Sequence, residues 1–163
     1  QHLKARHPYT NYEFWEEATQ GLPRMALGPG SDAHGGPGPV SDETMKAWLQ
    51  MERAYLYTGT QPASYTLGLI EAMMTGLPVV SIGPERMRIF SYSPDLFEGH
   101  EIAQNWNDDP VIVGNDLRSI LNDPDYAAML GRGCRDRAIE LFGKETIGRQ
   151  WAEYLGARVA VAA

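Results

Sequence analysis

The sequence contains one cysteine, Cys134, among 163 residues. A single thiol excludes a framework of intramolecular disulfides and is typical of a protein from a reducing compartment. Runs of lysine and arginine are also absent, and 21 acidic against 14 basic residues leave a net charge of −7. We therefore expect no nucleic-acid partner bound through its phosphates.

Long hydrophobic segments are missing as well. The most apolar stretch, 67–82, is interrupted by Glu71, Gly76 and Pro78, so it falls short of the roughly 20 apolar residues that span a bilayer. No signal peptide opens the sequence, which predicts a soluble cytoplasmic protein without a transmembrane segment. The first residue is Gln1 rather than Met, which favours a natural start further upstream.

Motifs for metal binding or nucleophilic catalysis are not found. The four histidines do not have the spacing of metal ligands, so neither a metal nor another cofactor is expected; they are His2, His7, His34 and His100. His34 lies in a glycine-rich loop, where we expect a solvated side chain, with contact to a ligand as the alternative. No nucleophile elbow occurs, and Cys134 falls within a predicted helix as a packing residue. No catalytic residue is assigned.

Apolar and amphipathic segments alternate along the chain in the pattern of βαβ units. Five short apolar runs are predicted strands, at 2–5, 24–27, 53–57, 78–82 and 111–113. Six amphipathic segments are predicted helices, at 11–19, 41–49, 66–75, 116–121, 126–141 and 144–155. No linker divides them, so we expect one α/β domain over 1–163. Its predicted architecture is three-layer α/β/α and Rossmann-like, with a parallel sheet.

Two further segments carry expectations. Residues 83–110 are too long for a simple connection and are expected to cover part of a binding site. Trp151, Tyr154 and Leu155 share one face of the last predicted helix. That face is expected to pack in the core, with a contact to another domain as the alternative.

The polar loop after the predicted strand 53–57 is the strongest candidate site. Ligands of an open parallel sheet collect at the carboxyl ends of its strands, and residues 58–66 lie at such an end without any charged side chain. A helix that begins near Tyr65 or Thr66 starts with amide groups that lack intrahelical partners. Those amides form a seat for a phosphate or diphosphate that needs no lysine.

Glu71 lies about one and a half turns into that helix, among apolar neighbours. Because helical side chains lean toward the N-terminus, its carboxylate is directed toward the predicted site. Its two oxygens can accept hydrogen bonds from the vicinal hydroxyls of a ribose. The spacing alone also fits a glutamate on a polar stripe of a half-exposed helix, or one bonded to nearby backbone.

Gly28, Pro29 and Gly30 follow the predicted strand 24–27. Such a turn lets the backbone approach a flat nucleotide base, and it equally fits a plain turn. As a phosphate-binding fingerprint it lacks the third glycine of G-x-G-x-x-G.

The run LGLIEAMMTGLPVVS (67–81), preceded by the loop PASYT, resembles the donor-binding lobe of GT-B glycosyltransferases of the GT4 (glycosyltransferase group 1) type. The matching positions are 71–73 and 76–80, and the similarity continues through the predicted C-terminal helices. It implies the C-terminal half of a GT-B fold, in a protein whose N-terminal lobe is absent from this chain. It also implies metal-free transfer of a sugar from a nucleotide-diphosphate sugar to an acceptor. The chain by itself would bind nucleotide without turnover.

The resemblance assigns roles to individual positions. It implies that Glu71 binds the donor ribose and that a phosphate-binding turn, with Arg6, faces the diphosphate and donor sugar; the turn comprises Ser64, Tyr65, Thr66 and Leu67.

The sequence departs from the family at one central position. The family has a second glutamate eight residues before the ribose-binding one, and here that position is Ala63. This departure leaves an alternative open, a non-catalytic GT-B-like binding or interaction module. A third possibility is another two-lobed enzyme of sugar nucleotides, such as an epimerase or a phosphorylase relative.

Overall fold

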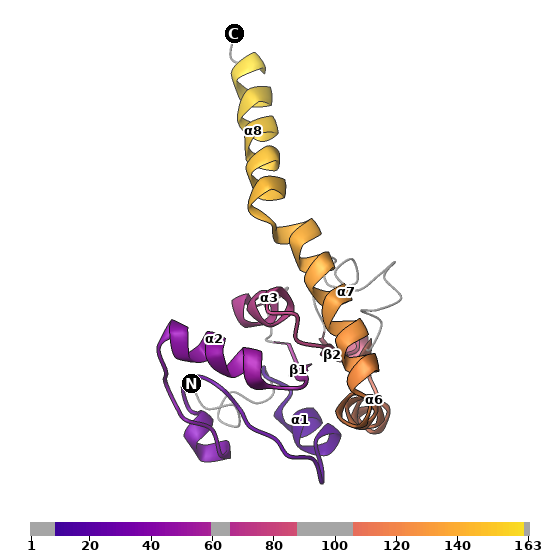
Figure 1. Cartoon of the computed structure of the whole chain (residues 1–163). Coiled ribbons are helices and arrows are strands. Elements are labelled where there is room, and N and C mark those ends of the chain that lie inside the picture. Colours follow the sequence, from indigo (N-terminus) through magenta and orange to yellow (C-terminus); the bar gives the residue numbers. More distant parts are fainter. Residues whose placement is uncertain (1–8, 60–65, 88–105, 162–163) are drawn as a thin grey trace.

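The sheet consists of three parallel strands in the order β1 (Tyr55–Tyr57), β2 (Val79–Ile82) and β3 (Trp106–Asn107). The structure is a computed structural model that describes residues 9–59, 66–87 and 106–161. The predicted strand 2–5 lies outside the described residues. The observed sheet confirms the α/β class with parallel pairing, and Figure 1 shows how the helices surround it.

The central strand β2 is buried along its whole length. Val79, Val80 and Ile82 are at most 1% exposed, because strands lie on both edges and helices on both faces. An uninterrupted apolar run is the expected sequence of a parallel strand covered on both faces. This explains why 78–82 was readable as a strand from the sequence.

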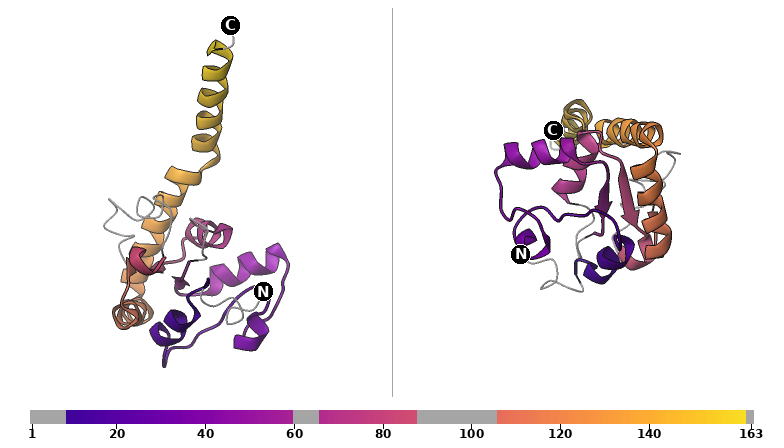
Figure 2. Two further views of the ribbon diagram at one scale, coloured as in Figure 1. Left: turned by 180° about the vertical axis from the view of Figure 1, so that it is seen from behind. Right: turned by 60° about the horizontal axis from the view of Figure 1, so that its bottom comes forward.

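Helices cover both faces of the sheet, as seen in Figure 2. On one side lie α2 (Asp42–Met51), α3 (Leu67–Met74) and α7 (Pro124–Phe142). On the other, α1 (Tyr12–Ala18) packs against α6 (Pro110–Asn122). The result is the predicted three-layer arrangement.

Side-chain caps begin several of these helices. Ser41 Oγ accepts from the Thr44 amide at 3.3 Å, as expected for a helix that starts after this serine. Asp109 accepts from the Val111 amide at 2.8 Å, and Pro110 occupies the first helical position.

The prediction of a strand at 111–113 is therefore wrong. Asp109 and Pro110 start a helix there, and the apolar run forms its first turn. Val113 is fully buried, whereas Val111 and Ile112 are 56% and 44% exposed. A short apolar run fits a strand or a buried helix equally, and here the start signal decided the outcome.

The prediction of a strand at 24–27 is also wrong, since this segment pairs with none of the described strands. It is extended chain that leads into the short 3-10 helix η1 (Ser31–His34). The sequence analysis missed β3 and α4 (Pro84–Met87), both within the stretch 83–110. Those two-to-four-residue elements are too short to show a periodic pattern.

The turn between α3 and β2 requires glycine. Gly76 has φ of +79°, the left-handed conformation that commonly ends a helix. Its amide donates to the Met73 carbonyl at 2.9 Å, and the Leu77 amide donates to Ala72 at 3.2 Å. Gly131 of α7 approaches the Gly76 carbonyl so closely that a Cβ on Gly131 would overlap it. Two glycines therefore set the distance between α3 and α7.

The last helix, α8 (Lys144–Val161), projects from the body of the molecule in Figure 1. Trp151, Tyr154 and Leu155 are 59%, 49% and 55% exposed. The expectation that they pack in the core is wrong, because α8 leaves the body at Gly143. Among the described elements, its main packing contacts are with α7.

Candidate functional site

The start of α3 lies at the carboxyl end of β1, where the sequence placed the site. Thr66 caps the helix, and its Oγ1 accepts from the Leu69 amide at 3.4 Å. The amides of Leu67 and Gly68, in the first turn, have no acceptor within the helix. The Leu67 side chain is 77% exposed. Two backbone donors are thus available at the positive end of the helix dipole.

The structure tests these predicted phosphate-binding positions only in part. Thr66 and Leu67 stand at the helix start, whereas Ser64, Tyr65 and Arg6 lie outside the described residues. The Thr66 hydroxyl already caps its own helix. The amides of the first turn, rather than the Thr66 side chain, are therefore the groups open to a ligand.

The carboxyl end of β1 is tied to the start of α1. Asn11 Nδ2 donates to the Thr58 carbonyl at 2.7 Å, and Thr58 Oγ1 donates to the Thr10 carbonyl at 3.0 Å. Asn11 has φ of +51°, a conformation that asparagine tolerates better than most residues. These two bonds hold the residue that follows β1 in place before the chain enters the loop.

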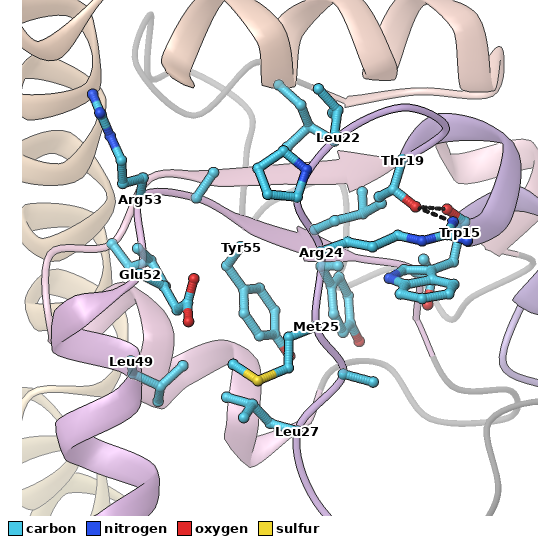
Figure 3. A pocket seen from close by; sticks show the side chains of 18 of the residues that line it. Trp15, Thr19, Leu22, Arg24, Met25, Leu27, Leu49, Glu52, Arg53 and Tyr55 are labelled. Carbon is cyan, nitrogen blue, oxygen red and sulfur yellow. Dashed lines mark hydrogen bonds between the residues drawn. The ribbon is translucent and has the colours of Figure 1, made fainter. Parts of the chain in front are cut away.

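A cavity of about 660 Å³ lies between β1 and the extended chain at 22–27 (Figure 3). Its walls are mostly apolar, and Tyr55 projects into its centre in Figure 3. Thr58, Gly59 and Thr66 line it as well, so the cavity reaches the edge of the sheet where α3 begins.

Arg24 lines the same cavity beside Trp15. Its guanidinium lies 4.4 Å from the centre of the Trp15 ring and donates to Thr19 Oγ1 at 2.7 Å. It also donates to the Glu16 carbonyl at 3.1 Å. The cation is held by the last turn of α1, in the geometry of a cation–π contact.

Two tyrosines of β1 also line this cavity, and the sequence analysis did not single them out. Tyr55 and Tyr57 are two residues apart in a strand, so both side chains leave the same face of the sheet. Burial, followed by the nearby Glu71 carboxylate, raises the pKa of Tyr55 to about 12. The alternation Tyr-Leu-Tyr in the sequence could have indicated that the two tyrosines share one face of this strand.

Tyr57 is the more deeply placed of the two, with 4% of its surface exposed. Burial and then Tyr55 raise the pKa of its hydroxyl to about 12, while Thr66 acts in the opposite direction. Thr66 is thus a near neighbour of the Tyr57 hydroxyl, but the two residues do not form a hydrogen bond. Among the described residues the Tyr57 hydroxyl has no hydrogen-bond partner.

Glu71 is exposed on α3 and lines a second cavity, a groove of about 620 Å³ between α2 and α3. Its apolar neighbours Leu69, Ala72 and Met73 face the core, so the carboxylate lies on the opposite stripe of the helix. The structure therefore places Glu71 and Thr66 on different cavities. Tyr55 lines the first cavity, and the Glu71 carboxylate contributes to its raised pKa.

The predicted base-binding turn is a structured bend. Gly28 and Gly30 have φ of +96° and +83°, and the Ser31 amide donates to the Gly28 carbonyl at 3.1 Å. Neither glycine nor Pro29 lines either of the two cavities described above. Their role toward a base stays a prediction.

His34 differs from the solvated side chain that was expected. It is half-buried, with its ring centre 5.1 Å from that of Tyr12 and 6.0 Å from that of Trp15. Its Nε2 is buried and has no hydrogen-bond partner among the described residues. The ring thus packs between η1 and α1.

Metal-binding groups and membrane spans were searched over the described part of the chain. No three His, Cys, Asp or Glu side chains there are grouped so that they could hold a metal ion. No helix in the same part is both long and apolar enough to cross a bilayer.

Comparison with known proteins supports the fold. No family model and no curated protein matches the sequence. Among solved structures, sucrose-phosphate synthase from Thermosynechococcus elongatus is similar, with a TM-score of 0.59 and 22% identity over 78% of this chain. This chain corresponds to 30% of the length of that protein. The likeness shows that the chain has a glycosyltransferase-like α/β fold.

Proposed function

We propose that the chain is the C-terminal, donor-binding lobe of a GT-B glycosyltransferase of the GT4 type. With an N-terminal lobe it would transfer a sugar from a nucleotide-diphosphate sugar to an acceptor. The observation that carries this proposal is the start of α3, where two amides without intrahelical partners lie at the carboxyl end of β1. The glycosyltransferase-like fold supports it.

The diphosphate would lie at the start of α3. The amides of Leu67 and Gly68 would donate to its oxygens and stabilise the charge that develops on the leaving group. The proposal keeps Ser64, Tyr65 and Arg6 as further contacts. No step requires a metal ion.

The ribose would lie beside Glu71. Glu71 is five positions after Thr66 in the sequence, which is about 7.5 Å along the helix axis. The carboxylate is exposed at the groove between α2 and α3. The proposal keeps Gly28, Pro29 and Gly30 as the contact for the base.

The exposed face of α8 supports the proposal that a second lobe belongs to this protein. Trp151, Tyr154 and Leu155 lie together on this face and are each about half exposed. The acceptor site and any catalytic base would belong to that other lobe. We accordingly expect the 163-residue chain to bind nucleotide without turnover.

Isothermal titration calorimetry with UDP, GDP and ADP tests the proposed function. One of the three is expected to bind, and Glu71→Gln should weaken its binding by about tenfold, since a charged acceptor makes the stronger hydrogen bond. Glu153→Gln is the matched control, because it makes the same change in charge on the exposed part of α8. Absence of binding by all three nucleotides at millimolar concentration would contradict the proposal.

Ala63 supports a second candidate, a non-catalytic module of the same fold. The family glutamate that contacts the donor sugar is absent at this position. The two candidates differ in turnover of the full-length protein. Formation of a glycosylated product from a nucleotide sugar would exclude the non-catalytic module.

A further inference from the structure

We propose that the Tyr57 hydroxyl is a hydrogen-bond donor to the diphosphate of the ligand bound at the start of α3. This inference rests on the proposed function and adds a side-chain contact to a site otherwise formed by backbone amides. It concerns Tyr57, the last residue of β1.

The first observation is the state of the hydroxyl itself. Tyr57 is 4% exposed, and its hydroxyl makes no hydrogen bond with any described residue. A buried polar group without a partner destabilises the fold, because it has lost its hydrogen bonds to water and gained none in return. Native proteins satisfy most such groups, so an exception of this kind points to a ligand that supplies the missing partner.

The second observation is where the hydroxyl lies. Tyr57 and Thr66 line the same cavity, at the edge of the sheet where α3 begins. The Thr58 and Thr66 hydroxyls at this edge already have partners, since Thr58 donates to Thr10 and Thr66 caps α3. The Tyr57 hydroxyl, in contrast, is buried and has no partner among the described residues.

The third observation is the kind of group that converges there. The amides of Leu67 and Gly68 and the hydroxyl of Tyr57 can all donate. The raised pKa of Tyr57, about 12, keeps its proton in place at neutral pH. These three donors suit an oxyanion, and the phosphate oxygens of a nucleoside diphosphate have this chemistry.

Tyr57→Phe removes the hydroxyl and keeps the ring, so it tests the inference directly. Affinity for whichever of UDP, GDP or ADP the wild-type chain binds should fall about five- to tenfold, and affinity for inorganic pyrophosphate should fall with it. The melting temperature without ligand should stay equal or rise, because the variant no longer buries an unsatisfied group.

Tyr12→Phe is the matched control. Its hydroxyl is satisfied, since it donates to Glu16 Oε1 at 2.7 Å, and it does not line the cavity. This variant should bind nucleotide like the wild type and melt at a lower temperature. Tyr57→Phe is therefore expected to lower affinity without lowering the melting temperature, and Tyr12→Phe to lower the melting temperature without lowering affinity.

Three outcomes would overturn the inference. Unchanged nucleotide affinity of Tyr57→Phe, with loss of affinity in Glu71→Gln, would refute the Tyr57 contact and leave the proposed function in place. A lower melting temperature with unchanged affinity would assign the hydroxyl a structural role. Absence of nucleotide binding by the wild type would refute both proposals.

Discussion

Tyr55 and Tyr57 show how single residues give the sheet edge its chemical character. In an apolar parallel strand such as β2, valine and isoleucine fill the space beneath the helices. In β1 two tyrosines occupy that space, and they carry their hydroxyls toward α3. Burial is the main cause of the raised pKa of each. Both side chains therefore stay neutral across the physiological range.

This burial predicts a loss of stability in alkali. Below pH 10 the tyrosines are protonated in both the folded and the unfolded chain, so their contribution is constant. Between pH 10 and about 12 the unfolded chain loses these protons first, because the folded pKa of Tyr57 is about 12. The free energy of unfolding should fall by about 1.4 kcal/mol per pH unit for each tyrosine.

Urea unfolding at pH 9, 10 and 11 measures this slope. Tyr57→Phe should lose stability less steeply than the wild type above pH 10, since one of the two buried hydroxyls is gone. Parallel slopes in the two proteins would show that Tyr57 ionises equally well in the folded chain.

At the scale of elements, glycine determines how closely α3 and α7 pack. Gly131 faces the Gly76 carbonyl, and the left-handed Gly76 directs the chain from α3 into β2. Arg135 of α7 donates to the Met74 carbonyl at the end of α3. The C-terminal end of α3 is thus held by α7, and this support orients the helix whose other end forms the candidate site.

Replacement of Gly131 by alanine should therefore destabilise the fold. The new Cβ would overlap a backbone carbonyl, and overpacking of this kind costs about 1–3 kcal/mol. Gly148→Ala in α8 is the control, because nothing lies within 4 Å of its Cβ position. That variant should be neutral or gain up to about 1 kcal/mol from helix propensity. Thermal unfolding compares the two, and equal effects would contradict the close approach of α7.

For the whole molecule, the main asymmetry is a compact body with one projecting helix (Figure 1). The core brings together α1, α3, α6, α7 and the strands, with Phe14, Leu69 and Ile120 at most 2% exposed. The described side chains of α8 from Gly148 to Gly156 are all exposed. The stability of the body therefore depends little on this helix.

Substitution of two aromatic residues, one in the body and one in α8, tests whether the stability of the body depends on α8. Phe14→Ala should destabilise the chain by about 3–5 kcal/mol, the usual cost of removing a buried ring. Trp151→Ala should change stability by less than about 0.5 kcal/mol, as surface substitutions generally do. Chemical denaturation measures the free energy of unfolding of both variants. A large loss in Trp151→Ala would show that α8 is covered in solution.

Local signals predicted most helices because their causes are local. Ser41 acts within a few residues of the helix that it starts. The pair Asp109–Pro110 is an equally local signal, but it was not recognised, and the apolar run after it was predicted to be a strand. The apolar run 78–82 was readable as a strand for its composition. The segment 24–27 is also short and mostly apolar, but it has no β-branched residue and pairs with none of the described strands.

At the candidate site, Glu71 and Tyr57 show which features could be predicted from the sequence and which could not. The position of Glu71 within α3 followed from the pattern of its neighbours, which also allowed an exposed carboxylate, but its place on the groove beside α2 did not follow from that pattern. Tyr57 carries no motif. Its significance depends on a cavity whose walls come from residues far apart in the sequence.

The amino-acid order alone established the α/β class, most of the helices and the central strand β2, since neighbouring residues compete for local backbone conformations. Tertiary packing decided which apolar runs became strands, how far α8 stands from the body and which hydroxyl was left without a partner. These outcomes depend on contacts between distant segments, and only the folded chain brings those segments together.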